Sequence, residues 1–149
     1  MIPEATPSPR VEQLVRSPGA CWIDADSLDA WIDAPGDRVL FFSGDPVRFP
    51  EGLDVAVVLP QLQAVFAGRF TVGVVRRDGE EAIARRFGSQ RWPALVFLRD
   101  GHYVTTLHGM HDWDVFVQRV AEALALPASR APGIGVPLVA AQGAAPGCH

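Results

Sequence analysis

The sequence has no lysine and only two cysteines among its 149 residues. Cys21 and Cys148 lie near opposite ends of the chain, which excludes a Cys-x-x-Cys redox motif and a cysteine-based metal cluster. All 13 basic residues are arginine, and 17 acidic residues outnumber them, so the formal net charge is −4. This balance argues against non-specific nucleic-acid binding, which needs a basic surface.

Long apolar runs are missing as well. No segment approaches the roughly 20 apolar residues that cross a membrane, so we expect no membrane insertion. The first residues, MIPEATPSPRVEQ, lack the basic start and the apolar core of a secretion signal, so we expect a cytoplasmic protein. A phosphate-binding loop, a Ser/His/Asp arrangement and a paired-carboxylate site are also absent. We therefore expect neither a cofactor nor catalytic residues.

What the sequence does contain is an alternation of strand and helix patterns. Short apolar runs between turn residues predict strands, and apolar residues at helical spacing predict helices. The expected strands are 21–23, 39–42, 70–75, 93–100 and 102–109, and the expected helices are 24–37, 55–67, 79–88 and a last one from 112 onward. Asp100-Gly101 is a turn signal that closes an antiparallel hairpin. The order predicts an α/β fold with a central mixed β-sheet flanked by helices on both faces.

Composition divides the chain into three segments. Residues 1–19 form an N-terminal arm, and its Pro-rich first ten residues are expected to fray. Residues 20–126 form the domain, in which we expect Cys21 to be a small buried side chain. Residues 127–149 are rich in Pro, Gly and Ala and have no apolar periodicity, so we expect a disordered or loosely attached tail.

The element order and one segment resemble thioredoxin. The stretch FGSQRWPALVFLRDG (87–101) is similar to the thioredoxin segment that turns through a cis proline into the closing hairpin, which places Pro93 at the cis proline. The resemblance also places Gly109 at the glycine that closes the substrate groove. Counted from Pro60, the redox cysteines would fall near Gly52 and Val55. Because disulfide exchange needs a thiolate, the oxidoreductase chemistry of thioredoxin is not expected here.

Three motifs resemble a narrower family. SGDPVRFPE (43–51), RWPALVF (91–97) and GMHDW (109–113) are similar to segments of the HyaE/HupG hydrogenase maturation proteins, which are thioredoxin-like and lack the cysteine pair. The resemblance implies a non-redox chaperone for an uptake [NiFe] hydrogenase. Its expected partner is the precursor of the small iron–sulfur subunit with its twin-arginine signal peptide, bound before export, and other hydrogenase accessory proteins are further expected partners.

Two other functions remain open. The protein could be a thioredoxin-like scaffold in a maturation complex that does not bind the signal peptide. It could also be a redox enzyme that uses Cys21 or Cys148, but both cysteines lie in the wrong segments to work beside Pro93. We therefore expect a protein without enzymatic activity.

The expected peptide-binding site surrounds Trp92 and Pro93. In thioredoxin-like proteins the residue before the cis proline offers free backbone groups to an extended peptide, and such strand addition needs no cysteine. The alternative is a turn proline beside a packing tryptophan. The loop Asp45–Asp54 would form one wall, with Phe49 either as an anchor or as a lid over the core. Further residues expected at the site are Met110, Gly109 and the acids Asp45, Glu51 and Asp54.

The acids of that loop would meet the arginines of a signal peptide, although surface acids commonly serve solubility alone. A second acidic group, Asp24, Asp26, Asp29 and Asp33, is expected to be a solvated helix face and is otherwise a docking face for a basic partner. His108-x-x-His111-Asp112 lacks a third ligand at a telling spacing, so we expect no metal site there and expect His111 to pack beside Trp113.

Overall fold

The computed structural model describes residues 8–129 of the chain. Residues 1–7 of the predicted arm and residues 130–149 of the predicted tail lie outside the described range. The three-segment division therefore stays a prediction for those residues. No helix in the described range has the length and apolar character needed to span a membrane.

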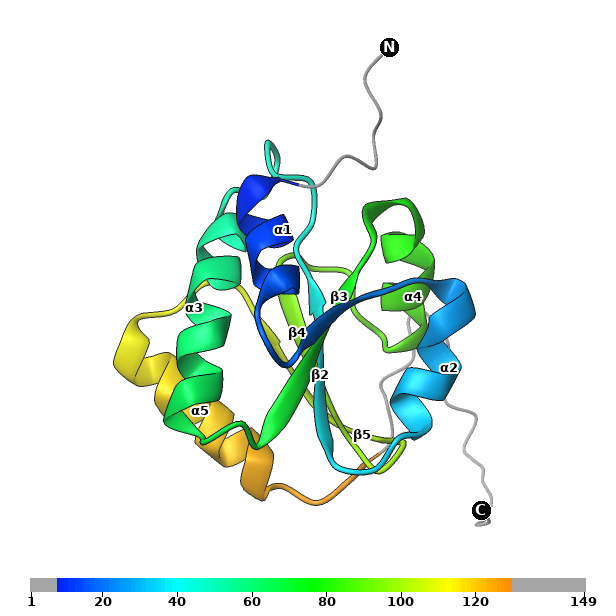
Figure 1. Ribbon diagram of the computed structural model, residues 1–149, viewed down its shortest axis with the longest axis vertical. Helices are drawn as coiled ribbons and strands as arrows, with labels where there is room; N and C mark the ends of the chain where they lie inside the picture. The colour runs from blue at the N-terminus through cyan, green and yellow to red at the C-terminus, as the bar shows by residue number, and fades with distance from the viewer. Residues whose placement is uncertain (1–7, 130–149) are drawn as a thin grey trace.

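A five-stranded mixed sheet forms the centre of the molecule (Figure 1). Its strands are β1 (Ala20–Ile23), β2 (Asp37–Phe42), β3 (Phe70–Val75), β4 (Ala94–Arg99) and β5 (His102–His108). They lie in the order β1-β3-β2-β4-β5. β3 pairs in parallel with β1 and β2, whereas the β2–β4 and β4–β5 pairs are antiparallel. The predicted mixed sheet with its closing hairpin is confirmed.

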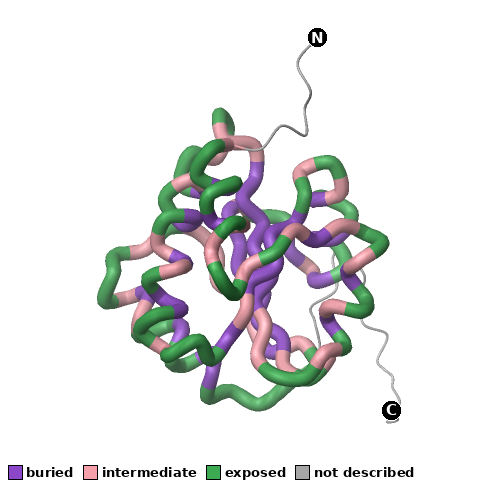
Figure 2. Tube along the Cα trace, in the orientation of Figure 1, coloured by how far each residue is buried: buried purple, intermediate pink, exposed green. Residues whose placement is uncertain are grey.

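Helices cover both faces of this sheet, as predicted. They are α1 (Pro9–Arg16), α2 (Ala25–Asp33), α3 (Glu51–Val65), α4 (Glu80–Arg86) and α5 (Trp113–Ala125), with a 3₁₀ turn η1 (Arg77–Gly79) before α4. One buried cluster joins α1, α3 and α5 to Val39 and Phe41 of β2. A second cluster joins α2 and α4 to Leu40 and Phe42 of the same strand. Since alternate residues of β2 face opposite layers, the apolar run 39–42 is buried on both sides (Figure 2).

Helix α1 belongs to the fold, although the sequence reading assigned it to the N-terminal arm. Ser8 caps the helix by accepting a hydrogen bond from the Val11 N–H at 3.2 Å, and Pro9 occupies its first turn. Val11 and Leu14 are buried in the cluster shared with α3 and α5. The signal was present as a Ser-Pro helix start followed by Val11, Leu14 and Val15, but the surrounding prolines obscured it.

Cys21 is exposed, so the prediction that it is buried is wrong. The residue lies on β1, an edge strand of the sheet, and the buried cluster that covers Ile23 does not extend to it. Partial burial raises the pKa of the Cys21 thiol, and the nearby Arg38 opposes that shift. A raised pKa keeps the thiol protonated and weakly nucleophilic at neutral pH.

Candidate functional site: the groove beside Trp92

A short loop (43–50) connects β2 to α3 at the end of the sheet that also carries Pro93. Helix α3 begins at Glu51, so it takes up the last four residues of the predicted loop. The Asp45 carboxylate accepts a hydrogen bond from the Val47 N–H at 3.2 Å, and the Asp45 carbonyl accepts one from the Phe49 N–H at 2.7 Å. These bonds fold the loop into a turn whose tip, Val47, is 87% exposed.

Gly44 lets the loop lie directly on Trp92. Its φ is +77°, and a Cβ atom there would stand 2.9 Å from the Cβ of Trp92 and 3.0 Å from Cδ2 of Phe49. The rings of Phe49 and Trp92 lie with centroids 5.7 Å apart and planes inclined by 36°. Phe49 therefore covers Trp92 and is held by it. The Trp92 Nε1–H is buried and has no hydrogen-bond partner within residues 8–129.

Glu80 holds the loop from beneath, and sequence reasoning missed this role. Its side chain is 1% exposed; Oε2 accepts a hydrogen bond from the Gly44 N–H at 3.0 Å, and Oε1 accepts one from Arg77 at 2.9 Å. Burial raises the pKa of Glu80, and the bonds from Gly44 and Arg77 partly offset that shift. In the sequence, Glu80 and Glu81 form a pair of acids at a helix start, and nothing there distinguishes the buried one from the exposed one.

A groove of about 600 Å³ opens between this loop and the start of α4. Its lining residues are Gly44, Asp45, Arg48, Phe49, Arg77, Asp78, Glu81, Ala82 and Trp92. Of the predicted site residues, the structure brings Asp45, Phe49 and Trp92 together here. Asp78 and Glu81 are acids of the groove that the sequence did not suggest. Because Glu80 pairs with Arg77, Arg48 is the lining cation without a carboxylate partner in the described residues.

The backbone around Pro93 adjoins Trp92, which lines the groove. The Trp92–Pro93 peptide bond is cis, and the Gly109 N–H donates a hydrogen bond to the Pro93 carbonyl at 2.9 Å. The backbone N–H and carbonyl of Trp92 form no hydrogen bond within residues 8–129. Met110, which follows Gly109, is 37% exposed but does not line the groove.

The two remaining predicted acids face elsewhere. Glu51 and Asp54 lie in the first turn of α3 and do not line the groove. Asp54 forms an ion pair with Arg10 of α1, with 3.5 Å between Nη1 and Oδ1. The acids at the groove are therefore Asp45, Asp78 and Glu81.

Both positions predicted to correspond to the thioredoxin cysteines are closed by packing. A Cβ atom on Gly52 would lie 2.2 Å from the carbonyl oxygen of Ser43, far inside van der Waals contact. Val55 is 1% exposed within the main core cluster. Helix α3 thus packs against the Ser43 backbone at Gly52 and into the core at Val55, and neither residue lines the groove.

Two acids of the group on α2 have structural partners. Asp24 caps the helix by accepting hydrogen bonds from the backbone N–H groups of Asp26 and Ser27, and these bonds lower its pKa. Asp29 forms an ion pair with Arg86 at 2.8 Å. Asp26 and Asp33 are exposed at the surface.

The two histidines near Gly109 form local contacts. Nε2 of His111 lies 2.8 Å from the His108 carbonyl, and the His111 ring packs edge-on against Phe116. Burial and the nearby Arg91 lower the pKa of His108. In the range 8–129, no cluster of three or more His, Cys, Asp or Glu residues has the geometry to hold a metal ion.

Comparison with known proteins identifies the family. The sequence pattern described as "Hydrogenase-1 expression protein HyaE" matches residues 11–116. The chain belongs to the HyaE family. The hydrogenase expression/formation protein HoxO of Cupriavidus necator is 54% identical over 143 residues, which cover 95% of this chain and 88% of that protein. The resemblance read from the three short motifs is thereby confirmed.

Solved structures agree with the HyaE assignment. A hydrogenase expression/formation protein HupG from Rhodopseudomonas palustris superposes with a TM-score of 0.50 at 33% identity, covering 70% of this chain and 94% of that one. A Plasmodium falciparum thioredoxin superposes with a TM-score of 0.58 at 14% identity, and the match covers 68% of this chain and 96% of the thioredoxin chain. The second likeness confirms the predicted thioredoxin-like fold.

Proposed function

We propose that this HyaE-family protein is a non-redox chaperone for the maturation of an uptake [NiFe] hydrogenase. It binds the precursor of the small iron–sulfur subunit through the twin-arginine signal peptide. Binding before export places the protein in the cytoplasm. Relatives named as hydrogenase expression/formation proteins support the maturation role. The observation that carries the peptide-binding role is the unbonded Trp92 backbone beside an acidic, aromatic groove.

An extended peptide pairs with the Trp92 backbone in this proposal. The N–H and carbonyl of that residue have no partner within the described chain, so strand addition satisfies two polar groups without breaking existing bonds. The aromatic pair of Phe49 and Trp92 offers apolar surface to the signal peptide's hydrophobic segment. Such aromatic anchors carry a large share of the binding energy in many interfaces.

Charge at the groove favours a basic partner. The lining acids Asp45, Asp78 and Glu81 face the lining bases Arg48 and Arg77, and buried Glu80 already neutralises Arg77. Arg48 lies over the Phe49 ring at 5.2 Å, which holds its guanidinium beside the aromatic pair. The surplus of negative charge lies where the paired arginines of the signal peptide enter, and arginine–carboxylate pairs are among the stronger hydrogen-bonded contacts.

The groove supports binding rather than catalysis. Gly52 and Val55 stand where a thioredoxin-like enzyme would place its thiols, and both are closed by packing. The protein holds the precursor and does not change it covalently. The alternative, a scaffold in a maturation complex, uses another surface, of which the acidic group on α2 is the candidate.

Titration of the signal peptide against groove variants tests the proposal. Phe49→Ala removes the aromatic cover, and binding of the synthetic signal peptide should weaken by about 1–3 kcal/mol. Asp45→Asn combined with Glu81→Gln should slow association and flatten its salt dependence. Asp114→Asn with Glu122→Gln is the matched control, because it removes the same two charges from exposed positions on α5. Equal loss in the charge variant and its control would refute groove binding.

A further inference from the structure

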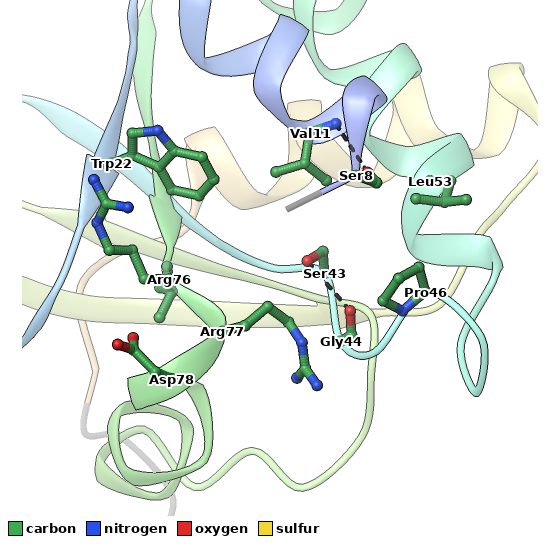
Figure 3. A pocket seen from close by; sticks show the side chains of 11 residues that line it. Ser8, Val11, Trp22, Ser43, Gly44, Pro46, Leu53, Arg76, Arg77 and Asp78 are labelled. Atoms are coloured by element: carbon green, nitrogen blue, oxygen red, sulfur yellow. Dashed lines mark hydrogen bonds between the residues drawn. The ribbon is translucent and has the colours of Figure 1, made fainter. Parts of the chain in front are cut away.

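A second cavity lies at the carboxyl ends of β1, β2 and β3 (Figure 3). It shares Gly44, Arg77 and Asp78 with the groove, but its other walls come from α1, β1 and the first turn of α3. Its volume is about 60 Å³. Since a water molecule needs about 10–15 Å³ on this measure, the cavity has room for one aliphatic side chain.

The walls of this cavity are mainly apolar. Val11 of α1 and Trp22 of β1 face Pro46 and Leu53 across it (Figure 3). Val75, the last residue of β3, also lines the cavity. These residues come from separate parts of the chain that the parallel strands bring to one edge of the sheet. Crevices outside the carboxyl ends of the strands are the common ligand sites of α/β sheets.

Two charges of opposite sign lie at its rim. The Arg76 guanidinium lies over the Trp22 ring at 4.7 Å, and Asp78 is exposed two residues further on. Within residues 8–129 neither side chain forms an ion pair or a hydrogen bond, whereas Arg77 between them is bound to Glu80. One free donor group and one free acceptor group match the carbonyl and N–H of a peptide.

We propose that this cavity binds one aliphatic residue of a partner polypeptide. The side chain fills the space between Trp22 and Leu53. The main-chain carbonyl of the bound residue accepts hydrogen bonds from Arg76, and its N–H donates to Asp78. The cavity adjoins the groove beside Trp92 and shares Gly44, Arg77 and Asp78 with it, so one polypeptide partner can contact both.

Titration with capped amino acids tests the site. N-acetyl-leucine N-methylamide is added to the ¹⁵N-labelled full chain, and the Trp22 indole and Gly44 amide signals are followed by NMR. Saturable shifts are expected by about 50 mM, the range for so small a ligand. N-acetyl-alanine N-methylamide should bind about tenfold more weakly or worse, because it leaves the cavity unfilled. Free leucine is the comparison ligand, because its carboxylate would meet Arg76 and its ammonium would meet Asp78. It should bind no more tightly than the capped form if the site takes a residue of a polypeptide.

Variants test whether the capped leucine binds in the cavity or elsewhere on the surface. Leu53→Phe fills the space and should abolish saturable shifts, whereas Val65→Phe, on the same helix but exposed and outside the cavity, should leave them unchanged. Arg76→Gln with Asp78→Asn changes only exposed rim residues, and it should weaken binding about threefold or more. Phe49→Ala should not affect this titration, which distinguishes the cavity from the groove.

Three results would overturn the proposal. The first is the absence of saturable shifts at Trp22 and Gly44. The second is equal binding of the leucine and alanine compounds, which would show that the cavity does not receive the side chain. The third is tighter binding of free leucine than of its capped form, which would make the ligand an amino acid instead of a polypeptide.

Discussion

At the scale of residues, Gly52 stands at one of the two positions predicted to correspond to the thioredoxin cysteines. Its Cα packs against the Ser43 carbonyl so closely that any Cβ collides with the backbone. Gly52→Ala should therefore lower the free energy of unfolding by about 1–3 kcal/mol, the usual range for overpacking. Urea denaturation measures the change.

Gly79→Ala is the matched control for this substitution. Its Cβ would meet only Cδ1 of Ile83 at 3.9 Å, and the Gly79 φ of −115° suits any residue. Equal stability of the two variants would contradict the packing at Gly52. For the same reason, restoring a cysteine pair by Gly52→Cys and Val55→Cys should destabilise the fold without giving disulfide reductase activity.

The burial of Glu80 predicts that the stability of the protein depends on pH. Its pKa in the folded protein is raised above the ordinary 4.5, so the folded state holds the proton more tightly than the unfolded state does. The contribution of this carboxyl to the free energy of unfolding is therefore largest below about 4.5 and falls as pH rises from there through the raised pKa. Above the raised pKa it stays constant.

Glu80→Gln isolates this effect. The difference in free energy of unfolding, wild type minus variant, should decrease as the pH rises from 4, measured by urea denaturation at each pH. Glu81→Gln, the exposed neighbour on the same helix, should show no such trend. If the wild-type-minus-variant difference rises with pH, the hydrogen bonds from Gly44 and Arg77 lower the pKa of Glu80 more than burial raises it.

At the scale of elements, α1 is expected to contribute to the stability of the domain. Leu14 is 2% exposed in the cluster that α1 shares with α3 and α5. Leu14→Ala should cost about 2–5 kcal/mol, as for other buried leucines. Gln13→Ala changes the adjacent exposed residue and should stay close to the wild type in the same urea titration. Equal, small effects of the two substitutions would show that α1 contributes little to the stability of the domain.

The folded part is predicted to include Ser129, three residues past the sequence-based boundary at Leu126. The Ser129 N–H donates to the Tyr103 carbonyl at 2.6 Å, and its hydroxyl donates to the Val104 carbonyl at 3.1 Å, both on edge strand β5. A chain ending at Ser129 should be about 1–2 kcal/mol more stable than one ending at Leu126. Thermal unfolding of the two compares them directly, and equal midpoints would place the boundary at Leu126 again.

Over the whole molecule, the sequence predicted the parts of the fold that depend on local pattern. The run 39–42 indicated a doubly buried strand, and Asp100-Gly101 indicated the closing hairpin; both are present. The inward turn of Glu80 and the exposure of Cys21 depend on which neighbours cover each element, and these contacts come from distant segments. Residue type and spacing carry no information on such coverage.

The same limit applies to the groove. Asp45, Phe49 and Trp92 could be predicted because they belong to motifs beside Pro93. Asp78 and Glu81 could not be predicted as groove residues, because only the parallel pairing of β2 with β3 brings the start of α4 to the loop 43–50. The predicted Glu51 and Asp54 were misplaced because α3 begins four residues earlier than its apolar pattern indicates.

The most direct measurement titrates the purified protein with two forms of the hydrogenase small subunit, the precursor and the mature chain without its signal peptide. If the groove binds the signal peptide, the precursor should bind at least about tenfold more tightly, a difference of about 1.4 kcal/mol. Phe49→Ala should reduce that difference. Equal affinity for the two forms would contradict signal-peptide binding and favour docking of the folded subunit on another surface, with the acidic group on α2 as the candidate.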